Sequence, residues 1–253
     1  MLFSILIATN NSARVLPIAL KSLCSQSCTD YELIVIDNES SDGTLEVIKE
    51  FIPSAIIISE PDVGIYDALN KGLLRAKGDW IYVLGSDDQI ANKSVLQRVG
   101  ELVDSNSALI YGNVISTSGS SSKLIRMHPP DYYRSRGIVC PPIFHQSAFI
   151  RRSVLSKIGN FPLSLRIHAD HFLLTRAFLI ATPVYINETI CIYHSNGYSG
   201  LKLKNYFQSA REQLVINAFF GTSLWRLIKP LAKNFARALI NSFKDFLRSE
   251  RVT

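Results

Sequence analysis

Carboxylate, amide and hydroxyl side chains gather directly after three apolar stretches of this 253-residue chain. The groups that follow residues 3–8, 33–36 and 80–84 are Thr9-Asn10-Asn11, Asp37-Asn38-Glu39 and Ser86-Asp87-Asp88. Two carboxylates on a turn can bind a hard divalent cation through oxygen, so Asp87 and Asp88 are candidate ligands for such a cation. The pair can equally begin a helix, because acidic side chains accept hydrogen bonds from the first N–H groups of a helix.

A further polar turn, Ser40-Ser41-Asp42-Gly43-Thr44, follows the second group. It is typical of a loop that caps the next helix, since Ser and Asp side chains bond to nearby backbone N–H groups. The same residue types after a strand also suit contacts to a bound polar ligand. The sequence therefore leaves a structural and a ligand-binding interpretation of Asp42 open.

The apolar stretches are expected to be the strands that position these groups. Residues 3–8, 33–36, 55–58 and 80–84 are continuous apolar runs, typical of strands buried on both faces of a parallel sheet. Helical periodicity lies between them, at Val15–Leu23, Leu45–Phe51 and Ala68–Ala76. The alternation predicts a Rossmann-like α/β unit over the first ~90 residues. Because ligands bind beyond the carboxyl ends of strands in such sheets, the polar groups are predicted to meet in one crevice.

The composition fits a folded domain of this size. Apolar residues make up 47% of the chain and charged residues 19%, so a sizeable core is expected and disorder is not. The four cysteines do not predict a disulfide framework, and Cys24 and Cys28 lack partners at zinc-site spacing, which favours reduced thiols. No signal peptide is expected at the apolar start, and no stretch reaches the ~18–20 apolar residues of a membrane span.

The net charge of +6 is concentrated at the carboxyl end. From Leu201 onward ten Lys and Arg stand against three Asp and Glu, whereas the first 200 residues hold 17 against 18. A basic tail on a nearly neutral body does not indicate a nucleic-acid-binding domain, so no nucleic-acid partner is expected.

The segment 223–248 has the pattern of an amphipathic helix. At roughly 100° per residue, one face is apolar and the opposite face is basic. The apolar face holds Leu224, Ile228, Leu231, Phe235, Leu239, Phe243 and Phe246, and the basic face holds Arg226, Lys229, Lys233, Arg237, Lys244 and Arg248. Pro230 is expected to kink this helix or to begin a second one. The segment suits the headgroup region of an anionic membrane, or a helical hairpin that packs on the rest of the chain or on a second subunit.

Several longer motifs of the chain resemble those of one enzyme family. They are FSILIATNN, VIDNESSDGT, PDVGIYDALNKGLLRAKGDWIYVLGSDD, FHQSAFIRRSVLSKIGNFP, HADHFLLTR and YHSNGYSG. In this order they resemble the family 2 glycosyltransferases with the GT-A fold, and most of all bacterial enzymes of exopolysaccharide, O-antigen and colanic-acid assembly. The resemblance implies an α/β fold, Rossmann-like, with a mostly parallel central sheet flanked by helices.

The resemblance covers about residues 1–200 and so implies a domain organisation. Residues 1–200 would form the GT-A catalytic domain, with a nucleotide-sugar-binding half at 1–91 and an acceptor half at 92–200. Beyond the resemblance, the charge and periodicity of residues 201–253 predict a C-terminal appendage of basic amphipathic helices.

The resemblance also implies roles for residues at matching motif positions. Asp37 would bind the nucleotide base, and Thr9 and Asp42 would line the same pocket. Asp87 and Asp88 would hold Mg²⁺ or Mn²⁺ on the diphosphate. The residues implied beside the ribose, phosphates and sugar are Asp62, Gly64, Asp67, Asn70, Lys71 and Ser86, together with Asp87.

The catalytic base implied by the resemblance is Asp170, in HADHFLLTR. Ala169 stands where the family has a Glu beside this Asp, and Gly85 stands at the first position of the family's Asp-X-Asp triplet. The Gly85 departure leaves open which of Asp87 and Asp88 holds the metal.

Other residues near these motifs can have either a functional or a structural role. His168 and His171 flank the implied base without a Cys or a third spaced His, so they do not predict zinc. His145 and His194 lie in the resembling motifs and are candidates for acceptor or phosphate contacts. Tyr66 suits either the sugar site or the core.

Together these features predict an inverting, metal-dependent glycosyltransferase. Its donor would be a nucleotide sugar and its acceptor a glycan or lipid-linked molecule, in bacterial surface-polysaccharide synthesis. A cation would neutralise the leaving diphosphate, and one carboxylate would take the proton of the acceptor hydroxyl, so a single displacement inverts the anomeric carbon. The expected location is cytoplasmic, peripheral on the inner face of the membrane, and the C-terminal helices are also candidates for a homo-oligomer contact.

Two other functions remain open from the sequence. A sugar-phosphate nucleotidyltransferase uses a similar sheet, but it normally has a Gly-rich basic loop after its first strand, where this chain has Ala8-Thr9-Asn10-Asn11-Ser12. A non-catalytic nucleotide-sugar-binding relative is compatible with Gly85 and Ala169. Metal-dependent hydrolysis of a nucleotide sugar would distinguish an enzyme from such a relative.

Overall fold

The computed structural model of the chain describes residues 1–104, 106–119, 121–180, 182–194, 203–222 and 232–236. The chain divides into two compact units. One is formed by residues 1–163 and 169–195, and the other by residues 164–168 and 196–253.

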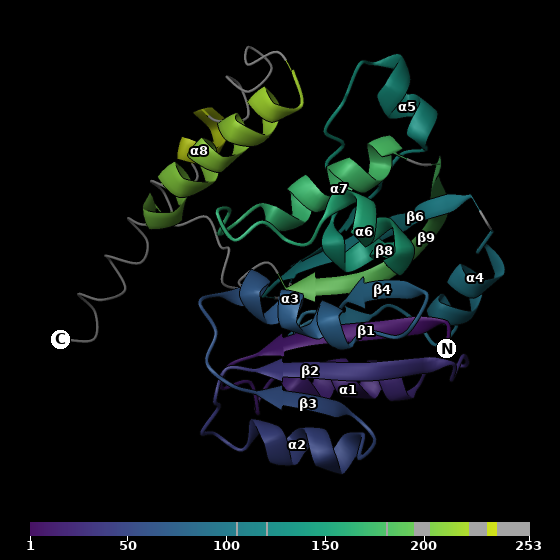
Figure 1. The fold of residues 1–253 in the computed structure, drawn as a ribbon, viewed down its shortest axis with the longest axis vertical. Helices are drawn as coiled ribbons and strands as arrows, with labels where there is room; N and C mark the ends of the chain where they lie inside the picture. The colour runs from purple at the N-terminus through teal and green to yellow at the C-terminus, as the bar shows by residue number, and fades with distance from the viewer. Residues whose placement is uncertain (105, 120, 181, 195–202, 223–231, 237–253) are drawn as a thin grey trace. The chain divides into compact units, whose positions relative to one another are not determined.

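The first unit begins with strands that alternate with helices (Figure 1). The strands are β1 (Phe3–Thr9), β2 (Tyr31–Asp37), β3 (Ile56–Ser59) and β4 (Trp80–Val83), and the helices are α1 (Leu16–Cys24), α2 (Thr44–Phe51) and α3 (Ile65–Arg75). Each strand overlaps one of the apolar runs from which it was predicted, and each helix overlaps one of the periodic segments.

Short elements and two long strands complete the first unit. The strands are β5 (Gln89–Ile90), β6 (Ser107–Ser118), β7 (Ser121–Ile125), β8 (Ala148–Arg151) and β9 (Thr182–His194). The helices are α4 (Val95–Glu101), α5 (Pro130–Ser135), the one-turn 3₁₀ helix η1 (His145–Ser147), α6 (Arg152–Ile158) and α7 (Ala169–Ile180).

The strands of the described chain form one sheet in the order β3-β2-β1-β4-β8-β6-β9-β5, with β7 paired to β6. The first four strands are parallel, β8 is antiparallel to both β4 and β6, and β6 is parallel to β9. β1, β2, β3, β4, β6 and β9 therefore point the same way, and their carboxyl ends share one edge of the sheet. The amino end of β8 lies at that same edge because β8 runs in the opposite direction.

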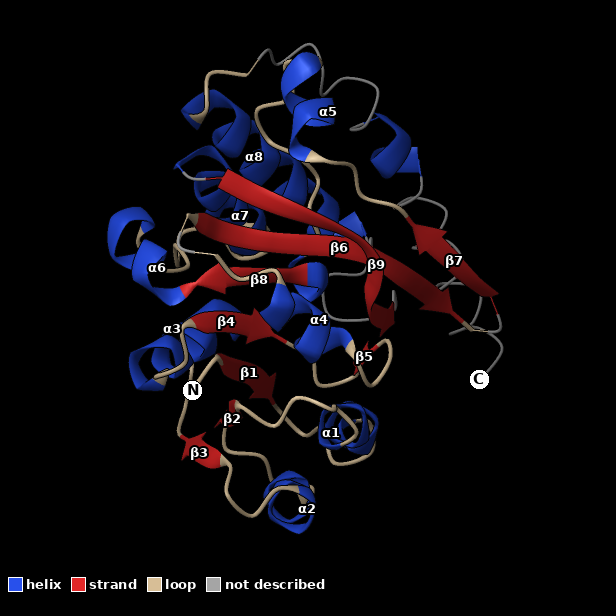
Figure 2. Cartoon of the chain, turned by 90° about the vertical axis from the view of Figure 1, so that its right-hand side faces the viewer, coloured by secondary structure: helices blue, strands red, loops and turns tan. Residues whose placement is uncertain are grey.

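The central strands are buried on both faces, which is why their sequences are continuously apolar. Ile5 and Ile7 pack in a cluster with side chains of α1. Leu6 faces the other way, towards α3, where a Cβ on Gly72 would come within 2.6 Å of Ile36 and 3.3 Å of Leu6. α1, α2 and α4 lie along one face of the sheet, and α3, α6 and α7 lie along the other (Figure 2).

The second unit contains α8 (Leu203–Phe219) and a helical turn at residues 232–236. The ring of Phe235 in this turn lies 5.1 Å from the ring of Tyr206 and 6.4 Å from that of Phe207, both in α8. Most of the predicted amphipathic segment 223–248 lies outside the described residues. None of the helices in the described ranges is long and apolar enough to cross a membrane.

Candidate active site

Asp37 lies at the carboxyl end of β2, in register with Thr9 of β1 and Ser59 of β3. The Thr9 hydroxyl donates to Asp37 Oδ1 at 2.9 Å, and the Ser59 hydroxyl donates to Oδ2 at 3.0 Å. Ser40 adds two donors, its N–H to Oδ2 at 2.9 Å and its hydroxyl to Oδ1 at 2.5 Å. Asp37 is completely buried. In this structure it therefore joins three strand ends to the following loop, and its contact with a nucleotide base remains a prediction.

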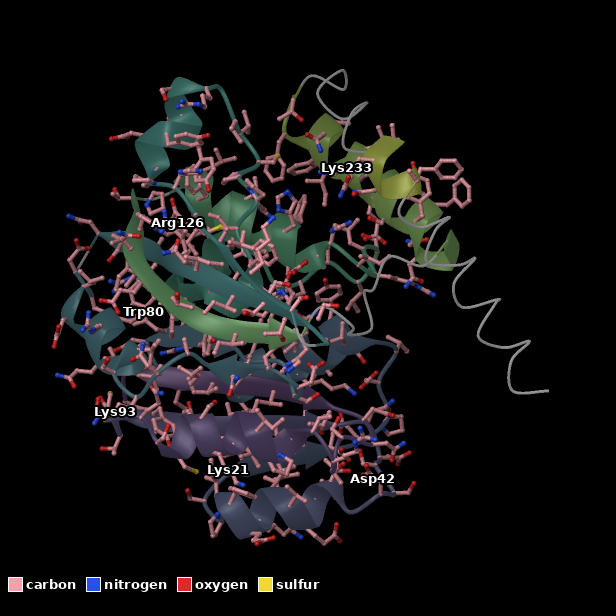
Figure 3. The ribbon with its side chains drawn as sticks, turned by 180° about the vertical axis from the view of Figure 1, so that it is seen from behind. Lys21, Asp42, Trp80, Lys93, Arg126 and Lys233 are labelled. Atoms are coloured by element: carbon pink, nitrogen blue, oxygen red, sulfur yellow. The ribbon has the colours of Figure 1, made fainter. Side chains whose placement is uncertain are left out.

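Asp42 is exposed, in the loop that precedes α2 (Figure 3). Its Oδ2 accepts from the N–H of Ala13 at 3.0 Å, and its Oδ1 accepts from the N–H and hydroxyl of Thr44 at 3.1 and 2.5 Å. These hydrogen bonds, first the one from the Thr44 hydroxyl, lower the pKa of Asp42. Asp42 thus ties the start of α2 to the loop after β1, which is the structural interpretation of the turn.

The loop before α3 carries the next predicted residues. The Asp62 N–H donates to Asn38 Oδ1 at 3.0 Å, and Asp62 Oδ1 accepts from the Gly64 N–H at 2.8 Å. Gly64 precedes the helix with φ at 135°, which side chains with a Cβ rarely adopt, and its Cβ direction faces open space. Asp67 Oδ2 accepts from the Val63 N–H at 3.2 Å. A helix N-terminus favours anions, so this turn suits phosphate groups.

Asn70 and Lys71, one turn further along α3, have partners within the protein. Lys71 Nζ donates to the Pro61 carbonyl at 2.6 Å and pairs with Glu60 at 3.0 Å, and the Glu60 hydrogen bond is the main cause that raises the pKa of Lys71. The Asn70 amide donates to the Phe161 carbonyl at 2.9 Å and accepts from the Phe161 N–H at 3.0 Å. Asn70 thus positions the segment around Phe161, and contacts of either residue with ribose or phosphate remain predictions.

Asp87 and Asp88 follow β4 on a tight turn that depends on Gly85. The Asp88 N–H donates to the Gly85 carbonyl at 3.1 Å. A Cβ on residue 85 would overlap Asp88 Oδ2, so a larger residue fits there only if this carboxylate moves. Gly85, which stands in place of the first Asp of the Asp-X-Asp pattern, therefore leaves the space that the Asp88 carboxylate occupies.

Asp88 is only 3% exposed and is also held by β9. Its Oδ1 accepts from the backbone N–H of His194 at 3.0 Å. Burial and then the charge of Asp87 raise the pKa of Asp88 to about 6, against smaller lowering effects of His194 and His145. Two neighbouring carboxylates, one of them buried, repel each other, and a divalent cation between them would offset this repulsion.

The donor set at this turn fits a cation that shares its shell with other ligands. No group of three or more His, Cys, Asp or Glu side chains able to hold a metal occurs among the residues that the structure describes. Asp87 and Asp88 supply carboxylate oxygens alone, which suits Mg²⁺ or a similar ion that keeps several waters and binds substrate phosphates.

Asp170, in the first turn of α7, is held by two residues from other elements. Its Oδ2 lies 2.5 Å from Nδ1 of His145, and its Oδ1 accepts from the Tyr66 hydroxyl at 2.9 Å. When the Asp170 carboxylate is ionised it only accepts, and His145 Nδ1 is then the donor. Burial lowers the pKa of His145, but the charge and hydrogen bond of Asp170, with the charge of Asp88, raise it overall.

The topology explains why these three residues meet. α3 and α7 each precede a strand that points towards the carboxyl edge, so both helices begin at that edge, with Tyr66 and Asp170 in their first turns. His145 is in η1, directly before the antiparallel strand β8, which also begins at that edge. The carboxyl ends of β1, β2, β4 and β9 lie there as well, with Thr9, Asp37, the Asp87–Asp88 turn and His194.

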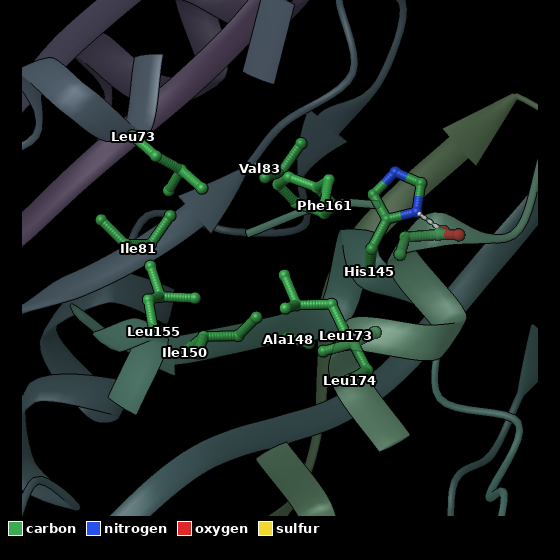
Figure 4. Close-up of a pocket in the computed structure, with 11 residues that line it drawn as sticks. Leu73, Ile81, Val83, His145, Ala148, Ile150, Leu155, Phe161, Leu173 and Leu174 are labelled. Atoms are coloured by element: carbon green, nitrogen blue, oxygen red, sulfur yellow. Dashed lines mark hydrogen bonds and ion pairs between the residues drawn. The ribbon is translucent and has the colours of Figure 1, made fainter. Parts of the chain in front are cut away.

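A cavity of about 20 Å³ lies beside the His145–Asp170 pair (Figure 4). Nine of its eleven lining residues are apolar, among them Leu73, Val83 and Leu173, and the two polar ones are His145 and Asp170. Its volume suits about one water molecule. Apolar surroundings strengthen the hydrogen bond between the pair, because the local dielectric is low.

Sequence reasoning missed four contacts of this site, of which the fourth is the hydrogen bond from the Tyr66 hydroxyl to Asp170. Ser40 and Ser59 were not expected to hold Asp37, and His145 was expected to contact acceptor or phosphate rather than Asp170. Strand-end hydroxyls beside a buried acid were the available indication for the first two. No local pattern indicates the third, because His145 and Asp170 are 25 residues apart.

This sheet, mostly parallel and flanked by helices, has the GT-A fold of glycosyltransferases. The family model described as glycosyl transferase family 2 matches residues 4–159. The chain belongs to this family and is a glycosyltransferase.

Curated relatives match from about two thirds of this chain to nearly all of it. A PGL/p-HBAD biosynthesis glycosyltransferase of Mycobacterium tuberculosis is 34% identical over 94% of this chain and 94% of its own length. An uncharacterized glycosyltransferase of the same species is 31% identical over 66% of this chain and 64% of its length. The descriptions of these relatives do not support the more specific resemblance to exopolysaccharide and O-antigen enzymes.

Solved structures share the fold at low sequence identity. TarS of S. aureus in complex with UDP-GlcNAc has a TM-score of 0.66 at 20% identity, over 94% of this chain and 72% of that chain. The mannosyltransferase PcManGT of Pyrobaculum calidifontis, in complex with GDP-Man and Mn²⁺, has a TM-score of 0.65 at 19% identity, over 95% of this chain and 69% of that chain.

Proposed function

We propose that the chain transfers a sugar, with inversion, from a nucleotide-sugar donor to a hydroxyl of a glycan or lipid-linked acceptor. The observation that carries this proposal is the meeting of Asp87, Asp88 and Asp170 at the carboxyl edge of the sheet. Two of these carboxylates suit a cation on a diphosphate, and the third suits a proton acceptor. The fold neighbours that contain UDP-GlcNAc and GDP-Man support a nucleoside-diphosphate sugar as the donor.

The donor would bind along the loops that follow β1, β2 and β4. The exposed Asp42 loop and the Asn38 side chain border the base end of this edge, and the α3 N-terminus at Gly64 offers N–H groups to phosphate. Ser86 lies on the same turn as the two acids after β4. These residues would orient the sugar with its anomeric carbon towards Asp170.

Asp87 and Asp88 would hold Mg²⁺ or Mn²⁺, and the Mn²⁺ in one fold neighbour supports this choice. When bound, such a cation supplies positive charge that stabilises the leaving diphosphate. The buried position of Asp88 also keeps water away from its charge, which strengthens its attraction for a cation.

Asp170 would act as the base in one displacement step. As the acceptor oxygen bonds to the anomeric carbon, its proton moves to the Asp170 carboxylate. At the same time the bond from that carbon to the diphosphate oxygen breaks, and the electron pair leaves with the diphosphate. Attack from the face opposite the leaving group inverts the anomeric centre.

A donor screen followed by turnover tests this proposal. We expect one nucleotide sugar to raise the thermal midpoint in the presence of Mn²⁺, because a ligand that binds only the folded state stabilises it. Turnover of that donor should be lost in Asp87→Ala and Asp88→Ala. It should fall ~10²-fold or more in Asp170→Asn, while donor binding in this variant stays unchanged.

Turnover that persists in EDTA and in both metal-site variants would contradict the metal-dependent mechanism. Donor binding without any turnover would favour the non-catalytic relative.

The acceptor is proposed to lie at a membrane surface, in bacterial surface-glycan synthesis. The basic charge of the last 53 residues and the amphipathic pattern of 223–248 support attraction to anionic lipid. The enzyme would then be peripheral on the cytoplasmic face, where a lipid-linked acceptor lies in the same plane. The contact of Phe235 with α8 is the observation that favours the alternative, a helical hairpin that packs on protein.

A further inference from the structure

The environment of Asp170 is built from residues outside the metal turn. Its Oδ2 lies 2.5 Å from His145 Nδ1, and its Oδ1 accepts from the Tyr66 hydroxyl at 2.9 Å. The donors come from η1 and α3, and Asp170 comes from α7.

Each donor is itself held in place. The Tyr66 ring stacks on Phe161 at 5.5 Å with an interplanar angle of 24°, and the backbone of Phe161 is held on both sides by Asn70. Tyr66 is 8% exposed, so its ring has little freedom. A chain of contacts thus runs from Asn70 through Phe161 and Tyr66 to Asp170.

His145 is held through the 3₁₀ turn that contains it. The carbonyl of the next residue, Gln146, accepts from the Tyr82 hydroxyl at 2.9 Å, and Tyr82 is fully buried in β4. Ser147 closes the turn through its hydroxyl and N–H, both to the Phe144 carbonyl at 3.0 Å. The imidazole is thus fixed relative to the core, while its side chain stays 29% exposed at the site.

We propose that His145 and Tyr66 are positioning residues that hold the Asp170 carboxylate in one orientation towards the acceptor hydroxyl. On one side the pair borders the apolar cavity, so bulk water does not compete for the carboxylate there. This inference rests on the proposed role of Asp170 as the base.

The test is a set of variants assayed with UDP-GlcNAc or GDP-Man, whichever wild type turns over, in the presence of Mn²⁺. His145→Ala should lower kcat about 10-fold or more and Tyr66→Phe about 3- to 10-fold, with donor KM nearly unchanged. His145→Asn should recover much of the loss, because its amide nitrogen can donate from the place of Nδ1. His128→Ala, at an exposed histidine outside the site, is the matched control and should leave kcat unchanged.

The double variant separates positioning from a general structural role. His145→Ala combined with Asp170→Asn should be no slower than Asp170→Asn alone, because residues that act through one group are not additive. Additive losses, or a His145→Asn variant as slow as His145→Ala, would overturn the proposal. The second result would instead indicate that the imidazole itself takes the proton.

Proton NMR supplies a readout that needs no turnover. A short His–Asp hydrogen bond should give a far-downfield Nδ1 proton resonance in wild type that is absent in His145→Ala and Asp170→Asn. Its absence from wild type would overturn the pairing. If the resonance is present but wild type turns over neither donor, it is the proposed donor chemistry that fails.

Discussion

At the scale of single residues, three carboxylates at one sheet edge have three different environments. Asp37 is buried and accepts from hydroxyls and an N–H group. Asp88 is buried beside a second acid, and Asp170 is held by an imidazole and a phenol. The same functional group is therefore suited to a structural joint, a cation ligand and a base, because its neighbours decide its charge and orientation.

Asp88→Asn should stabilise the metal-free protein. The folded-state pKa of about 6 lies above the ordinary 3.8, so the charged form of Asp88 is unfavourable in the fold. Stability of the metal-free wild type should therefore fall as the pH rises from about 4 to about 6 and stay low above that. At pH 7.5 in EDTA, denaturant unfolding should show a gain of about 1–3 kcal/mol in Asp88→Asn.

A matched control for that variant is Asp131→Asn, at a side chain that is 96% exposed, which should change nothing. With Mn²⁺ and a bound donor the order should reverse, since only wild type gains the ligand's stabilisation. A loss of stability in Asp88→Asn without metal would show that its hydrogen bond with His194 outweighs the repulsion.

At the scale of elements, the starts of helices and the ends of strands build the site. α3 and α7 begin at the carboxyl edge because each leads into a parallel strand. The reversed strand β8 brings η1 to the same edge, and with it His145. An insertion in β8 that shifted its register by one residue would turn its buried side chains to the other face and displace η1.

In the second unit, α8 holds the segment 166–168 through one acid. Glu212, 2% exposed, accepts from the N–H groups of Arg166, Ile167 and His168 at 2.8, 2.9 and 2.9 Å, and from the Gln208 amide at 2.5 Å. Burial raises the pKa of Glu212, but these hydrogen bonds together lower it below the ordinary 4.5.

Glu212→Gln should therefore cost stability in a pH-dependent way. A depressed carboxyl pKa adds stability that is fully present above the ordinary value and is lost as the pH falls through the folded value. We expect a loss of about 1–3 kcal/mol at pH 7 and a smaller difference from wild type near pH 4, measured by denaturant unfolding. Arg211→Gln, at the exposed neighbour, is the control. An equal loss at both pH values would contradict the ionised role of Glu212.

At the scale of the whole molecule, charge and hydropathy are divided unequally along the chain. The body is close to neutral, and the last 53 residues carry the basic excess. The described turn at 232–236 has Phe235 against α8, and the remaining basic residues of 223–248 lie mostly outside the described ranges. If the tail binds membrane, its removal should abolish binding to lipid vesicles. If the tail packs on protein, its removal should change the oligomeric state or the stability instead.

Truncation after Thr222 should abolish membrane binding. We expect the full chain to sediment with vesicles of anionic lipid at low salt and to be released by added salt, because charge attraction is screened. This truncation keeps α8, and with it the hydrogen bonds from the backbone of 166–168 to Glu212. A cut after Lys204 would remove Glu212 and these hydrogen bonds. Full-length protein that ignores anionic vesicles at low salt would contradict the membrane role, and a change of oligomeric state on truncation would favour a subunit contact.

The sequence alone determined the strands and helices of the first half and the polar groups at the strand ends. Residues 3–8 or 33–36 are apolar throughout, and a run of that kind is stable only where both faces are buried, so local pattern decided the sheet. The Asp87–Asp88 pair could likewise be singled out from its place after such a run. The secondary structure of the second half was harder to predict, because a strand as short as β8 has no distinctive hydrophobic periodicity.

Only the tertiary structure decided which partners each acid has. Tyr66 and Asp170 are 104 residues apart, and His145 meets Asp170 because one strand reverses direction. The burial of Asp37 by Ser40 and Ser59, and the room that Gly85 leaves for Asp88, are also contacts between segments rather than properties of a motif. Residue types set what chemistry is available, but the distances and burial that select among roles arise only when distant segments pack together.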